Sequence, residues 1–133
     1  MNSLEGHIKE VRVNGSLSLV TVALSDQILF KAIVIETPET ASYLTAGHLV
    51  KVLFKETEVI IGKDIKHLIS LQNQLRGVIR RIERGLLLSN ILINTPVGDI
   101  SSIITTNALD HLSLEEELIV CAMVKTNEIM LSE

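Results

Sequence analysis

The sequence is poor in aromatic residues, with one Tyr, two Phe and no Trp among its 133 residues. Proteins that bind single-stranded nucleic acids stack the bases on aromatic side chains. The chain also lacks an excess of positive charge, because 16 acidic residues outnumber 12 basic ones and the net charge is −4. A nucleic-acid partner needs a basic face. Both features argue against a nucleic-acid-binding protein.

Cysteine is nearly absent as well. The single cysteine, Cys121, excludes an internal disulfide bond, and its apolar surroundings in Leu118–Val124 favour a core residue over a nucleophile. No apolar run approaches the length of a membrane span, about 18 residues. The first residues, Met1–Gly6, lack the charged-then-apolar pattern of a signal peptide. We therefore expect a soluble cytoplasmic protein with no membrane contact.

Motifs of catalysis are missing too. The sequence has no nucleophile elbow, no Gly-rich phosphate loop and no zinc motif. The four histidines have no metal-ligand spacing; they are His7, His48, His67 and His111. We expect a binding protein that is not an enzyme and that has no protein-ligated metal ion.

The first half of the chain has strand-like patterns. Asn14-Gly15 predicts a hairpin turn, and the alternation slips near Val11, which indicates a β-bulge. Thr37–Leu44 predicts a short helix, with Thr37 as its N-cap and Pro38 in its first position. The expected strands are Leu4–Val13, Leu17–Leu24, Ile28–Ile35, His48–Lys55 and Thr57–Ile61.

The second half repeats the first. Leu75–Ile79 matches Leu4–Ile8 at an offset of 71 residues, and Lys125–Met130 matches Lys55–Ile60 at an offset of 70. Arg84-Gly85 takes the place of the first hairpin turn. The matching elements are strands at Leu75–Ile82, Leu86–Asn94, Asp99–Thr105, Leu118–Lys125 and Asn127–Leu131, with a short helix at Thr106–Leu112.

This order of elements predicts the fold class. Five short strands with a helix between the third and fourth are typical of a small Greek-key barrel of the oligonucleotide/oligosaccharide-binding (OB) type. We expect an all-β protein of two tandem OB-like five-stranded barrels, each with one short helix, at residues 1–62 and 70–133, joined by a connector at 63–69. A domain of roughly 60 residues is marginal alone. The halves should therefore pack on each other or on further copies, which predicts an oligomer.

The stretch Ser70–Gly77 stands directly before a strand of the second half. It offers a hydroxyl, several amides and a run of backbone N–H groups, which together can hold a small anion in spite of the acidic total.

This stretch reads Ser-Leu-Gln-Asn-Gln-Leu-Arg-Gly, and Lys-Thr-Asn-Glu-Ile-Met follows near the end of the chain. The two motifs and the duplication resemble the Mop, or molbindin, family of TOBE-type proteins, whose opening reads Ser-Ala-Arg-Asn-Gln-Leu-[Lys/Arg]-Gly. The resemblance implies a small cytoplasmic protein that binds molybdate or tungstate. It also implies a trimer of two-domain chains with the oxyanion at domain interfaces, and a possible transport ATPase as partner.

The resemblance implies a set of binding residues. Lys125 would supply charge, and Gln72 stands where the family carries Arg. The first half has no counterpart of Ser70, and Ile35 stands where the second half has Thr105. The oxyanion-binding residues implied are Ser70, Gln72, Asn73, Thr105, Lys125 and Thr126, with Lys55 as the matching lysine of the first half.

Each of these residues also has a structural interpretation. A lysine at the end of a strand protects a sheet edge, Ser70 and Asn73 are turn-forming residues, and Thr105 is an N-cap residue. Arg80, Arg81 and Arg84 form a solvated strand face.

The function also has alternatives. The first is storage or homeostasis of molybdate or tungstate. The second is a regulatory or oligomerisation module of molybdate transport that has lost part of its anion binding. The third is a protein that binds single-stranded nucleic acid, which the negative net charge and the few aromatic residues disfavour.

Overall fold

The computed structural model describes residues 1–64 and 67–133, so the predicted connector at 63–69 falls partly outside the described residues. The described residues form ten strands and one α-helix. The elements are β1 (Asn2–Asn14), β2 (Leu17–Ala23), β3 (Leu29–Val34), β4 (Leu49–Phe54), the 3₁₀ turn η1 (Glu56–Glu58), β5 (Ile60–Gly62), β6 (Asn73–Arg84), β7 (Leu88–Thr95), β8 (Gly98–Thr105), α1 (Thr106–His111), β9 (Ile119–Val124), the 3₁₀ turn η2 (Thr126–Glu128) and β10 (Met130–Ser132).

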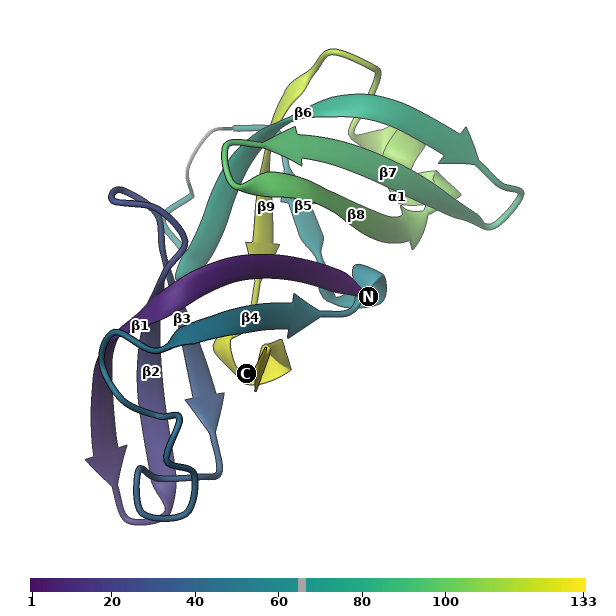
Figure 1. The fold of residues 1–133 in the computed structure, drawn as a ribbon. Coiled ribbons are helices and arrows are strands. Elements are labelled where there is room, and N and C mark those ends of the chain that lie inside the picture. Colours follow the sequence, from purple (N-terminus) through teal and green to yellow (C-terminus); the bar gives the residue numbers. More distant parts are fainter. Residues whose placement is uncertain (65–66) are drawn as a thin grey trace.

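The strands form two antiparallel sheets of five, which confirms the predicted all-β, OB-like fold. Sheet A has the order β10-β4-β1-β2-β3, and sheet B has the order β5-β9-β6-β7-β8. Each half of the sequence gives its last strand to the sheet of the other half (Figure 1). Ile61 of β5 pairs with Ala122 of β9, and Leu131 of β10 pairs with Val52 of β4. The sheets therefore exchange one strand each across the predicted boundary.

The internal repeat is visible in the irregularities of the strands. The register of β1 against β2 shifts between Ile8 and Glu10, and that of β6 against β7 shifts between Ile79 and Arg81. The predicted bulge is therefore present, two residues before Val11, and recurs at the matching place of the second half. The turns η1 and η2 also occupy matching places.

The helix predicted at Thr37–Leu44 is wrong, and turns take its place. Only one helix-like hydrogen bond forms there, from the Ala41 N–H to the Thr37 carbonyl at 2.8 Å. The Thr40 hydroxyl accepts from the Thr37 N–H and donates to the Thr37 carbonyl. Such local side-chain bonds compete with helix formation. Ala41 and Leu44 are buried nevertheless, so the segment covers the core without a helix.

Several boundaries also differ from the predictions. The first hairpin turn is Gly15-Ser16, because Asn14 still pairs with Leu17, and Gly15 has the positive φ of 66° that such a turn requires. The strand predicted at Thr57–Ile61 begins with η1 and is a strand only at Ile60–Gly62. Its counterpart near the end of the chain differs in the same way.

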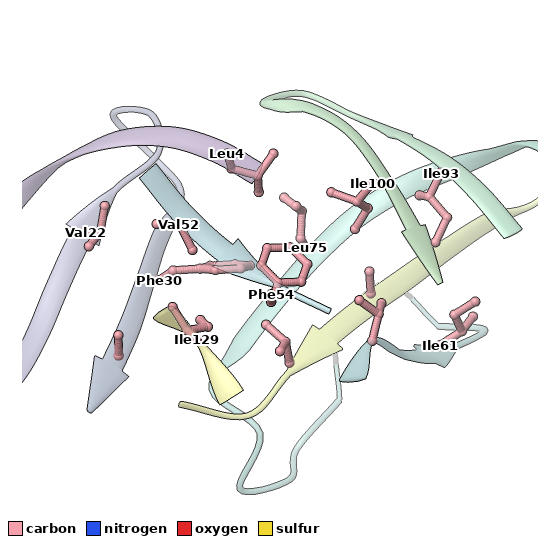
Figure 2. Close-up of a cluster of buried hydrophobic side chains, with 14 of the residues drawn as sticks. Leu4, Val22, Phe30, Val52, Phe54, Ile61, Leu75, Ile93, Ile100 and Ile129 are labelled. Atoms are coloured by element: carbon pink, nitrogen blue, oxygen red, sulfur yellow. The ribbon is translucent and has the colours of Figure 1, made fainter. Parts of the chain in front are cut away.

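One hydrophobic core joins the two sheets. Side chains from both halves converge between them (Figure 2), among them Leu4, Phe54, Leu75 and Ile100, none more than 2% exposed. Phe30 and Phe54 pack with ring centroids 6.5 Å apart. The buried side chains of the two sheets thus belong to a single cluster.

The described part of the chain contains no helix with the length and apolarity needed to cross a membrane.

Candidate anion-binding site

Gln72 and Lys125 lie next to each other at one end of sheet B. The ladder between β6 and β9 ends at the pair Asn73–Val124. Gln72 precedes Asn73 and Lys125 follows Val124, so antiparallel pairing places the two residues side by side just beyond the ladder. Both are exposed. Lys125 has extended backbone angles, φ −72° and ψ 145°, and is the N-cap residue of η2, which begins at Thr126.

Two shallow depressions border Gln72. One, of about 590 Å³, is lined by Ser70, Gln72 and Gln74 together with other residues of the segment 67–74. The second, of about 330 Å³, is lined by Gln72 and Arg76 from the second half and by Leu29 from the first. Gln72 therefore has polar neighbours on both sides and open access for a small anion.

Gln74 fixes the segment that carries Ser70. Its amide oxygen accepts from the His67 N–H at 2.8 Å, and its amide nitrogen donates to the carbonyls of His67 and Leu71, both at 2.8 Å. The three hydrogen bonds hold the backbone on both sides of Ser70.

Asn73 is buried, and its side chain joins the two halves of the chain. Its amide nitrogen donates to the Lys31 carbonyl at 2.8 Å, and its amide oxygen accepts from the Lys31 N–H at 2.7 Å. Asn2 does the same with Ser101, at 2.8 Å for both bonds. Asn73 thus binds the edge of β3, the outermost strand of sheet A, and Asn2 binds the edge of β8, the outermost strand of sheet B. The Asn73 side chain therefore holds β6 in place.

Replacing Asn73 with alanine is expected to lower the free energy of unfolding by about 1–2 kcal/mol, because the Lys31 N–H and carbonyl lose their partners in a partly buried place. Urea unfolding measures the change. Asn94→Ala is the matched control, since Asn94 is exposed and makes one hydrogen bond, to Asp99; a change within about 0.5 kcal/mol is expected there. Equal losses in the two variants would contradict the structural role of Asn73.

Comparison with known protein families matches residues 69–131 to the TOBE domain. These residues are similar to a TOBE domain, and we call this segment the TOBE domain. The resemblance seen in the sequence is thereby confirmed for the second half. The TOBE domain contains β6 to β9 and α1, and it supplies β10 to sheet A.

Among solved structures, the chain is similar to the cytoplasmic molybdate-binding protein ModG in a crystal form with molybdate bound. The TM-score is 0.90 at 22% sequence identity, over 98% of this chain and 94% of that chain. This likeness shows that the fold of the whole chain is that of ModG. MopII from Clostridium pasteurianum, in an apo form, matches 47% of this chain and 94% of its own, with 27% identity and a TM-score of 0.45. No curated protein sequence matches the chain.

Thr105 lies at the opposite end of the TOBE domain from Gln72 and Lys125. It pairs with Leu88 at the last position of β8, whereas Gly98 begins that strand beside Thr95. The Thr105 hydroxyl accepts from the Ala108 N–H at 3.0 Å and caps α1. One copy of the chain therefore does not bring Thr105 together with Lys125.

Lys55 lies outside the TOBE domain, at the matching end of sheet A. It follows Phe54, which pairs with Asn2, and it is the N-cap residue of η1 as Lys125 is of η2. The Met1 amino group donates to the Glu56 carboxylate at 2.8 Å, and this hydrogen bond lowers the pKa of Glu56. Lys55 therefore belongs to a second, separate group of residues.

Lys31, a residue of the first half, meets the TOBE domain at Asn73. Its backbone N–H and carbonyl are both bonded to the Asn73 side chain. The contact crosses from the first half to the second, and the sequence carried no signal for it.

Cys121 is fully buried in β9, which confirms its interpretation as a core residue. Its thiol lies 3.6 Å from the Gln74 amide oxygen, and burial raises its pKa. A buried thiol with a raised pKa is a poor nucleophile near neutral pH. Among the residues that the structure describes, no three His, Cys, Asp or Glu side chains converge to hold a metal ion.

Proposed function

We propose that this chain binds molybdate or tungstate as a cytoplasmic storage or homeostasis protein. The observation that carries the proposal is the pair Gln72 and Lys125 at an accessible end of the TOBE domain, beside Ser70 and Thr126. The fold is shared with ModG, which binds molybdate.

The chemistry of this group suits a tetrahedral dianion. Molybdate needs N–H and O–H donors that converge on its oxygens and positive charge to offset its own. Lys125 supplies an ammonium, Gln72 an amide, and Ser70 and Thr126 hydroxyl groups. No step of bond making is required, so the proposed role is binding and not catalysis.

The position of Thr105 favours an oligomer in this proposal. Thr105 pairs with Leu88 in the β7–β8 ladder, beside Leu86 and Leu87. Leu86 is 95% exposed and Leu87 is 77% exposed. Adjacent exposed apolar side chains mark interaction surfaces. A neighbouring copy that covers these leucines would carry Thr105 into an interface, and we propose a trimer in which the oxyanion lies between domains.

Replacing Lys125 with alanine is expected to weaken molybdate binding by about tenfold or more, because a charge-assisted hydrogen bond is lost. Titration calorimetry with molybdate, tungstate and sulfate measures the affinities. Lys9→Ala is the control, since Lys9 is an exposed lysine of β1. Equal affinities of the two variants would contradict the role of Lys125.

The exposed leucines also favour the second candidate, a regulatory or oligomerisation module, with a transport ATPase as a possible partner. Absence of heat with all three oxyanions would support this candidate over the first. The mass of the native assembly, measured with and without molybdate, tests the trimer.

A further inference from the structure

The structure contains two matching junctions between the sequence halves. The Asn73 junction consists of Asn73, Lys31 and Lys125, and the Asn2 junction consists of Asn2, Ser101 and Lys55. In each junction the asparagine holds the backbone of a residue on an opposite strand edge with two hydrogen bonds. In each junction a lysine follows the residue that pairs with the asparagine. The junctions differ at one position, where the first has Lys31 and the second has Ser101.

The Lys31 backbone lies at the end of sheet B that Lys125 follows. The Lys31 backbone is within 2.8 Å of the Asn73 side chain, and Asn73 pairs with Val124, the residue before Lys125. The turn η2, which directly follows Lys125, also packs against β3. Lys31 is half-buried between buried Phe30 and Ala32, so its side chain leaves β3 on the side away from the core.

Within the described ranges 1–64 and 67–133, the ion pairs involve neither Lys31 nor Lys125. The carboxylate of Glu128, on η2, forms no ion pair with them. A dianion carries two negative charges, and Lys125 offsets only one of them.

We propose that Lys31 supplies the second positive charge to the oxyanion that Lys125 and Gln72 bind. This inference rests on the proposed function. It makes the binding site a product of both sequence halves, since the first half provides one cation and the TOBE domain provides the other. The Asn2 junction has a hydroxyl in place of this cation, so the Asn73 junction is the stronger site.

Two variants of Lys31 test the proposal. Lys31→Met removes the charge but keeps the length of the side chain, and it leaves the backbone contact with Asn73 intact. Lys31→Arg keeps the charge. Lys51→Ala is the control, because Lys51 is an exposed lysine of β4. Affinities for molybdate are measured by titration calorimetry on the full chain, and the urea midpoint of each variant is measured in parallel.

Lys31→Met is expected to weaken molybdate binding by about tenfold or more with an unchanged urea midpoint. Lys31→Arg and Lys51→Ala are expected to retain the affinity. Wild-type affinity in Lys31→Met would overturn the proposal and leave the proposed function standing. Equal weakening in Lys31→Met and Lys31→Arg would overturn it too, because charge would not be the cause. A wild-type chain that binds none of the oxyanions would overturn the proposed function and this inference together.

Discussion

Phe54→Ala is expected to lower the free energy of unfolding by about 3–5 kcal/mol, the usual loss for a fully buried aromatic side chain. Phe54 is 1% exposed and packs against Phe30. It lies where side chains of both sheets meet, with Leu75 and Ile100 from sheet B (Figure 2). The cavity left by its removal would therefore weaken both sheets. Urea unfolding followed by far-ultraviolet circular dichroism measures the loss.

The same experiment tests whether the two sheets unfold together. Because they share one core, wild type and Phe54→Ala are each expected to show a single transition. Leu49→Ala is the matched control, since Leu49 lies on the same strand and is 75% exposed. A change within about 0.5 kcal/mol is expected there. Two separate transitions in the wild type would show that the sheets are independent.

Gly77→Val is expected to destabilise the chain by about 3 kcal/mol, because a side chain at this position overpacks the core. A Cβ atom on Gly77 would lie 2.4 Å from the Ile93 Cγ2 and 2.8 Å from the Asn94 carbonyl oxygen. The second contact is with backbone, which cannot turn away as a side chain can. The fall in the midpoint of thermal or urea unfolding measures the effect.

A valine one position earlier provides the control for this substitution. Arg76 is exposed on the same strand, so Arg76→Val introduces the same side chain without overpacking. Gly6 holds the matching position of sheet A, where a Cβ would lie 2.7 Å from the Ala23 carbonyl oxygen. Gly6→Val should therefore be as harmful as Gly77→Val. Near-wild-type stability of either glycine variant would refute the close approach.

Much of the fold could be predicted from the sequence, because the strand patterns and the repeat are local signals. The strand exchange could not. Ile60–Gly62 and Met130–Ser132 are three residues long, and their apolar character suits the outer position of either sheet. Contacts between residues far apart in the sequence decide which sheet each of these strands joins. One such contact is the hydrogen bond of Ser102 to the Val59 carbonyl, at 2.8 Å, which binds the segment before β5 to β8.

The candidate site, too, could be predicted only in part from the sequence. Gln72 precedes β6 and Lys125 follows β9, so antiparallel pairing of these two strands brings the residues together. The positions of strand ends can be predicted from the sequence. The resemblance also implied Asn73 as an anion-binding residue, and the bonds of its side-chain amide to the Lys31 backbone could not be read from the sequence. Lys31 itself could not be found, because only the packing of the first half against the second brings it there.

The exchange of β5 and β10 has a consequence for the making of the chain. Residues 130–132 form the strand beside β4, so on the ribosome sheet A cannot be completed before these residues have emerged. Until then β4 presents a bare edge, the kind of edge that recruits foreign strands. A nascent chain that has not yet reached β10 therefore leaves this edge open to pairing with strands of other chains.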